Sequence, residues 1–328
     1  SGFALALWNL GRTLWQARPL PLPARFVTIG LLCAGATAAL GIVFALVLDG
    51  ATDNPRLADL TTYGIPVHAA AGLGGWLTFT ALGVSYRLLA MFMLAPELDS
   101  ARSRAALYSG TVALAVVILG GTAAICLGRG LNAVFAVSSL LGLCAVALYG
   151  ADILHLYRAR KRRKIELNAR MAAVALTNLT VLVLLSVALI ALGRFEAQIG
   201  AVVFLTAFGW LTGLGLAKLY KIVAFLTWLE CYGPVLGKTP TPRVQDLVVE
   251  SRAAKWFWLY FAGVWSATAC LLLETPAGFR ASAALMLAGT IGIGVQIVRT
   301  RLMADVKAEL RLSHLTRRPP LLASQQAH

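Results

Sequence analysis

One histidine lies inside a long apolar stretch, and its type and setting favour chemistry more than those of any other residue. His68 is followed by three alanines and by the glycine-rich stretch 72–75. An imidazole is expensive to place in lipid, so it marks a candidate functional site. The small neighbours leave room for a flat macrocycle or for a closely packed helix. We expect His68 either to ligate a metal, such as a haem iron, or to donate a structural hydrogen bond, for example to residues 61–63.

An acidic residue also lies inside an apolar stretch, near the other membrane face. Asp152 precedes His155 by three residues, so both lie on the same side of one helix. Asp152 could relay protons there, or it could pair with Arg87, Lys218 or Lys221, which we expect at a similar depth. These three basic side chains could instead reach the interface and hold a propionate or a lipid phosphate.

The positions of the two histidines limit the possible cofactor sites. His68 and His155 lie near opposite membrane faces, roughly 20 Å or more apart at a rise of about 1.5 Å per residue. They cannot both ligate one haem, so a second axial ligand would have to come from elsewhere, such as a second subunit. We also assign Trp76, Tyr86 and Arg87, which follow His68 on the same expected helix, to cofactor binding.

The sequence contains no further constellation typical of catalysis. No group of His, Cys, Asp or Glu has the spacing of a zinc, copper or di-iron site. The absence of a complete catalytic set argues against an enzyme without excluding one.

The composition predicts that these residues are held by membrane-spanning helices. Of the 328 residues, 59% are apolar and 13% are charged, whereas soluble domains carry about a quarter charged residues. A span needs about 20 mostly apolar residues, because a helix satisfies its own backbone in hydrocarbon. We predict an all-α protein with eight spans, at residues 25–50, 65–94, 106–127, 131–154, 171–193, 198–228, 256–273 and 276–298.

The basic residues predict the orientation of these spans. Of the 29 lysines and arginines, only Arg56, Arg129, Arg194 and Arg280 fall on the side opposite the N-terminus. Basic loops stay in the cytoplasm during insertion, so both termini are expected there, in a bacterial inner membrane. The net charge of +15 is therefore first a topology signal rather than a sign of nucleic-acid binding.

An internal repeat predicts the arrangement of the helices. Residues 75–92 (GWLTFTALGVSYRLLAMF) align without a gap with residues 209–226 (GWLTGLGLAKLYKIVAFL). The two segments belong to the second and sixth expected spans, so the units have four helices each and insert in the same orientation. The expected parts are an interfacial segment 1–24, a first repeat 25–157, a basic cytoplasmic linker 158–170, a second repeat 171–301 and a cytoplasmic tail 302–328.

The segment 68–92 (HAAAGLGGWLTFTALGVSYRLLAMF) resembles the second helix of the haem–copper oxidase subunit I family. That family is built from three parallel four-helix units, and this chain would hold two. The resemblance implies that His68 ligates a low-spin haem. Ala90 stands where relatives often have proline.

The departures from the family concern its oxygen-reducing centre. The copper-ligating histidine of the sixth helix would fall within 198–208, where this chain has Val202 and no histidine. The family's other paired histidines are also missing. The resemblance therefore implies a reduced relative without an oxygen-reducing centre.

Together, these features predict a non-catalytic, oxidase-like subunit of a larger respiratory or redox complex. It would hold one b-type haem through His68. The alternatives are a structural or assembly subunit without a cofactor and a transporter of a small solute. The expected partners are the lipid bilayer and other membrane subunits or a second copy of the chain, and not nucleic acid.

Overall fold

Every element in the described part of the chain is a helix. The computed structural model describes residues 2–238, 240–307 and 310. Seven helical stretches among them are long and apolar enough to cross a membrane, which makes this an all-helical, multi-pass membrane protein. These stretches are Leu22–Leu48, Ile65–Met93, Ala101–Cys126, Asn132–Arg158, Leu167–Ala191, Ile199–Val235 and Pro276–Arg301.

The seventh expected span differs from the other seven. Residues 256–273 fall largely in helix α12 (Glu250–Leu272), which is long enough to span but is not one of the seven apolar stretches. Its first turns carry Glu250, Arg252 and Lys255, and its interior is richer in Trp, Tyr, Gly and Ser than in Leu or Val. The helix is therefore present, and its place in the membrane stays a proposal.

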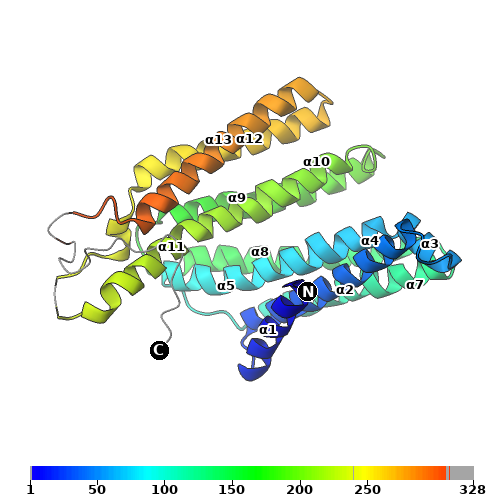
Figure 1. The fold of residues 1–328 in the computed structure, drawn as a ribbon, viewed down its shortest axis with the longest axis horizontal. Coiled ribbons are helices and arrows are strands. Elements are labelled where there is room, and N and C mark those ends of the chain that lie inside the picture. The colour runs from blue at the N-terminus through cyan, green and yellow to red at the C-terminus, as the bar shows by residue number, and fades with distance from the viewer. Residues whose placement is uncertain (1, 239, 308–309, 311–328) are drawn as a thin grey trace. The chain divides into compact units, whose positions relative to one another are not determined.

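The described residues form two compact units, which are divided between Arg163 and Lys164. In the first unit, coloured blue to green in Figure 1, the first long helix packs against the second, and the third packs against the fourth. Its elements are α1 (Gly2–Gln16), α2 (Leu22–Leu48), α3 (Pro55–Tyr63), α4 (Ile65–Ala69), η1 (Ala70–Phe79), α5 (Thr80–Met93), α6 (Ala101–Ala115), η2 (Val116–Gly120), α7 (Gly121–Cys126) and α8 (Asn132–Arg158).

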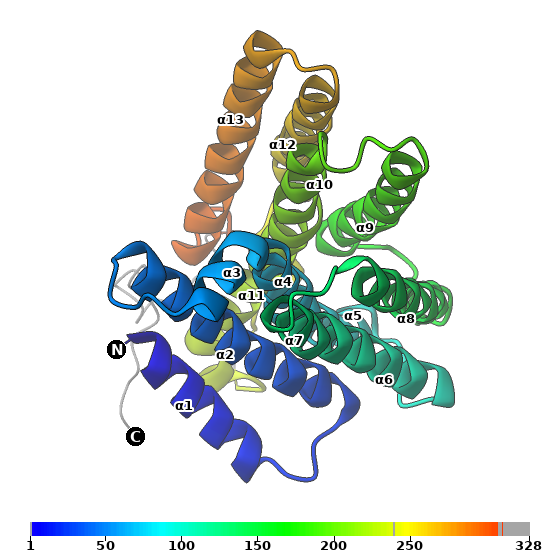
Figure 2. The same ribbon diagram turned by 90° about the vertical axis from the view of Figure 1, so that its right-hand side faces the viewer.

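The second unit has the same order of packing. Its first long helix, α9, packs against the second, α10–η3–α11, and α12 lies alongside α13, as Figure 2 shows. Its elements are α9 (Leu167–Ala191), α10 (Ile199–Phe204), η3 (Leu205–Thr212), α11 (Gly213–Tyr232), η4 (Gly233–Val235), η5 (Val244–Leu247), α12 (Glu250–Leu272) and α13 (Pro276–Arg301).

The second long helix of each unit widens into a π-helix over the repeated sequence. The wide segment η1 contains Gly75 to Thr78, and η3 contains Gly209 to Thr212. Each glycine lies where the helix approaches its neighbour closely. A Cβ on Gly75 would lie 2.5 Å from the Cβ of Cys33 on α2, and one on Gly209 would lie 3.3 Å from the amide nitrogen of Asn178 on α9.

The connection between the first two expected spans, residues 51–64, contains the short helix α3. Asn54 caps this helix, because its side chain accepts a hydrogen bond from the backbone N–H of Arg56 at 3.0 Å. Pro55 occupies the first helical position, where its missing N–H has no consequence. Leu60 of α3 then packs with Leu40, Val67 and Ile125, which closes this end of the first unit.

Candidate functional site

His68 lies in α4, two residues before the π-helical segment begins. Its ring is half-buried and faces α2, where the centroid of the Phe44 ring lies 5.4 Å away. The ring carbon Cε1 would be only 3.5 Å from a Cβ on Gly41. A glycine at that position therefore gives the imidazole its space beside α2.

The nitrogen Nδ1 of His68 is buried and has no hydrogen-bond partner in the described part of the chain. The threonine hydroxyl groups that we considered as acceptors make no hydrogen bond with this nitrogen and donate within their own helix. Thr61 donates to the carbonyl of Leu57 at 2.9 Å, and Thr62 donates to that of Ala58 at 3.0 Å. The structural hydrogen bond to residues 61–63 is therefore not formed.

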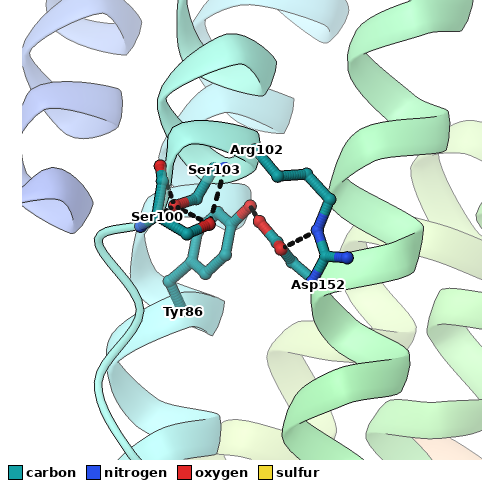
Figure 3. Close-up of polar contacts among 5 residues, drawn as sticks. All are labelled: Tyr86, Ser100, Arg102, Ser103 and Asp152. Atoms are coloured by element: carbon teal, nitrogen blue, oxygen red, sulfur yellow. Dashed lines mark hydrogen bonds and ion pairs between the residues drawn. The ribbon is translucent and has the colours of Figure 1, made fainter.

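Asp152 is the centre of a buried polar cluster in the first unit, which we call the Asp152 cluster (Ser85, Tyr86, Arg102, Tyr149 and Asp152). The Asp152 side chain is fully buried. The Tyr86 hydroxyl donates to one of its carboxylate oxygens at 2.8 Å, and Nε of Arg102 donates to the other at 2.5 Å (Figure 3). The hydroxyls of Ser85 and Tyr149 share a hydrogen bond of 2.6 Å beside them.

The partner of Asp152 differs from the one that the sequence suggested. We expected Arg87, Lys218 or Lys221, but the ion pair is made by Arg102. Arg87 pairs with Glu97 instead, and Lys221 pairs with Glu166 at 2.6 Å in the second unit. The prediction was wrong because it used only the expected depth of each side chain in the membrane. That depth does not tell which side of a helix faces which neighbouring helix.

Arg102 is positioned by the start of α6. Ser100 caps this helix, and its side chain accepts a hydrogen bond from the N–H of Ser103, while the Ser103 hydroxyl accepts one from the N–H of Ser100 at 2.8 Å (Figure 3). This reciprocal pair fixes the first turn, from which Arg102 reaches α8. The Ser-x-x-Ser spacing was a signal in the sequence that could have pointed to this helix start.

The other predicted site residues are not gathered around His68. His155 has an exposed side chain, whereas Asp152, on the same helix, is fully buried. Trp76 is half-buried and packs edge-on against Phe3 of α1 at a centroid distance of 5.8 Å. Tyr86 lies 18 residues beyond His68, roughly 27 Å along a helix with a rise of about 1.5 Å per residue. One haem at His68 would not reach it, and the same holds for Arg87.

The second unit holds a related set of side chains, which we call the Gln296 cluster (Tyr220, Arg252, Gln296, Arg299 and Asp305). Nε of Arg252 donates to the amide oxygen of Gln296 at 2.6 Å. Arg252 also pairs with Asp305, to which Arg299 donates at 2.8 Å. These two arginines, Arg299 foremost, hold the pKa of the Asp305 carboxyl below its usual range. The Tyr220 hydroxyl is buried and has no partner among the described residues.

These arrangements offer a position for a ligand at His68 and two sets of paired charges, around Asp152 and Asp305. Among the described residues, no three His, Cys, Asp or Glu side chains gather as they would around a metal ion. A haem iron needs only one such ligand from the chain, so His68 remains its candidate. Asp152 has both oxygens taken by donors, which suits a role in holding helices together. Comparison with protein-family models, with curated proteins and with solved structures finds no match for this chain.

Proposed function

We propose that this protein is a non-catalytic, oxidase-like membrane subunit that holds one b-type haem through His68 within a larger respiratory or redox complex. The observation that carries the proposal is the buried Nδ1 of His68, which has no partner in the described part of the chain. A buried polar atom without a hydrogen bond raises the free energy of the folded protein. For a histidine inside an apolar helix, such an unpartnered nitrogen supports the presence of a ligand.

The surroundings of His68 are compatible with a haem. Gly41 leaves space for the ring beside α2, the residues that follow His68, 69–72, are small, and Phe44 offers an aromatic neighbour. The chain would bind the group and orient it through the imidazole, while the haem would supply electron transfer. Among the described residues, no carboxylate or hydroxyl binds Nδ1, so this nitrogen lacks the supporting hydrogen bond that a ligating histidine usually makes. The second axial ligand would come from a partner subunit or a second copy of the chain.

A cofactor-free assembly subunit is the second candidate, and the Asp152 cluster favours it. Its charged and hydroxyl groups find their partners inside one unit, as they do where polar residues only hold membrane helices together. The two candidates differ in what they expect at His68. The first expects a ligand on the ring, and the second expects none.

An absorption spectrum of the purified protein distinguishes the two candidates. With haem, we expect a Soret band that shifts on reduction, and we expect His68→Ala to abolish it while the protein still inserts. His155→Ala is the matched control, because it removes an exposed imidazole at the far end of another helix and should leave the band intact. A wild-type protein without colour after expression with ample haem would contradict the haem proposal.

The finer organisation in the membrane is also a proposal. We propose eight spans, with α12 as the seventh, arranged as two parallel four-helix repeats with both termini in the cytoplasm of a bacterium. The π-helical segments η1 and η3 support the repeat, since both cover its GWLT sequence. Their glycines also face equivalent neighbours, because Cys33 and Asn178 each lie eleven residues after the first residue of their helix (22 to 33 and 167 to 178).

Cysteine labelling tests this orientation. A cysteine at position 56 should react with an impermeant reagent added from outside, and one at position 162 should be protected. The expectation follows from the basic residues, which concentrate on the side of residues 158–170. The reverse pattern would contradict the proposed topology.

A further inference from the structure

A groove runs between α1 and α2 on the outside of the first unit. It has a volume of about 370 Å³, within the range of roughly 300–1,000 Å³ that is usual for ligand sites. Leu7, Leu14 and Trp15 line it from α1, and Leu31, Leu32 and Gly35 line it from α2. Figure 2 shows the two helices lying beside each other. The groove is thus long, apolar and made of two helices from one unit.

The groove opens away from the protein. Trp15 and Leu32 are both 67% exposed, and α1 contains no fully buried residue. Leu31, Leu32 and Gly35 belong to a helix that is apolar enough to span the membrane, so we expect the opening to face lipid. Its one side-chain hydroxyl, on Thr28, already donates to the carbonyl of Ala24 at 2.9 Å. The walls are therefore suited to an acyl chain.

One charged side chain, that of Arg18, lies at one end of this groove. Arg18 lines it and lies over the ring of Trp15, with its guanidinium carbon 3.7 Å from the ring centroid. The apolar helix α2 begins four residues later, at Leu22, which puts Arg18 at the depth of the headgroups. Residues 1–48 include Arg12, Arg18 and Arg25 but no Asp or Glu. Among the described residues, Arg18 is therefore the only charged one that lines the groove, while the acidic residues Glu97 and Asp99 line a separate pocket with Pro21, Leu22 and Pro23.

We propose that the groove between α1 and α2 is a binding site for one anionic phospholipid, with an acyl chain along Leu31 to Gly35 and the phosphate on Arg18. A guanidinium binds phosphate oxygens through paired N–H donors, and its stacking on Trp15 leaves the edge with these donors free. The apolar walls hold the tail, and Arg18 selects the anionic headgroup. This is a specific site, distinct from the general attraction of a basic surface to a membrane.

Lipid competition followed by native mass spectrometry tests the site. The full chain in detergent is given equal amounts of phosphatidylglycerol and phosphatidylcholine with the same acyl chains. We expect the wild type to prefer phosphatidylglycerol at this site by about fivefold and Arg18→Gln to reduce the preference to less than about twofold, as expected for the loss of one headgroup contact. Arg12→Gln is the matched control, since Arg12 is exposed on the same helix but does not line the groove.

A second variant tests the acyl chain. A Cβ on Gly35 would have no atom within 4 Å, so Gly35→Leu should fill the groove without straining the fold and should abolish the preferred binding. Gly142→Leu adds the same bulk at another open position on α8 and should bind as the wild type does. The proposal would be overturned if Arg18→Gln or Gly35→Leu kept the preference for phosphatidylglycerol. It would also be overturned if Arg12→Gln lost this preference as fully as Arg18→Gln does. Circular dichroism shows that each variant is folded.

Discussion

The two units carry an arginine at the same place, but they give it different acceptors. Arg102 lies in the first turn of α6, and Arg252 lies in the first turn of α12. The first donates to Asp152 at 2.5 Å, and the second donates to Gln296 at 2.6 Å. Both acceptors lie twenty residues after the first residue of their helices (132 to 152 and 276 to 296). The two arginines and their acceptors thus have the same positions in their helices, but the acceptor is charged in the first unit and neutral in the second.

The difference shows where a negative charge can be kept in such a protein. In the first unit the carboxylate is inside the apolar helix α8, and it needs both Tyr86 and Arg102 as donors. In the second unit a neutral amide takes its place, the counterpart tyrosine Tyr220 has no partner among the described residues, and Asp305 lies beyond the end of α13. Both units thus have the hydrogen bond from the arginine, but only the first has its carboxylate inside the apolar region. In the second unit the carboxylate lies outside that region, in which a charge is least tolerated.

The largest expected difference between the two units comes from removing the acceptors, Asp152 and Gln296. We expect Asp152→Ala to lower the free energy of unfolding by about 3 kcal/mol, because it leaves Arg102 and the buried Tyr86 without their acceptor. This value is at the low end of the usual range, since Arg102 is 42% exposed. Gln296→Ala should cost only about 1 kcal/mol, since Arg252 keeps Asp305. Reversible unfolding in mixed micelles measures both. Equal losses would show that the two clusters do not differ in the way described.

A smaller effect separates the two tyrosines. Tyr86→Phe removes a hydroxyl that donates to a carboxylate, and it should cost about 1.5–2 kcal/mol. Tyr220→Phe removes a buried hydroxyl without a partner in the described residues, so the change should be close to zero or slightly stabilising. The same unfolding assay compares them, and each variant is the other's control. A loss in Tyr220→Phe as large as that in Tyr86→Phe would mean that this hydroxyl has a partner of its own.

The membrane-spanning helices were the part of the fold that could be predicted from sequence. Seven of the eight expected spans coincide with apolar helices, because length and hydropathy are local properties of the chain. Helix α3 lies in the connection between the first two expected spans and was not predicted, although Asn54 and Pro55 are a recognisable start of a helix. The wide π-helical segments were also missed, since the hydrophobic pattern of a span does not reveal an extra residue in a turn.

The polar contacts were less predictable, and Asp152 shows why. Its burial could be expected from its place in an apolar stretch, but Arg102 is 50 residues away and belongs to another helix. Depth in the membrane made Arg87 an equally good candidate, although the structure pairs it with the nearby Glu97. Only the rotation of each helix about its axis decides such pairings. That rotation is set by packing between helices, which the sequence of one helix does not contain.

The wide turn at η1 sets the rotation of the first end of its helix, with His68, relative to the second end, with Tyr86. A π-helical turn holds more residues than an α-helical turn, so it changes the angular offset between everything before it and everything after it. His68 precedes this turn, and Tyr86 follows it, directed at Asp152. The orientation of the imidazole is therefore coupled to the Asp152 cluster through the helical phase, although the two have no contact. Deleting one residue within 70–79 would change this angular offset and turn His68 or Tyr86 away from its present neighbours.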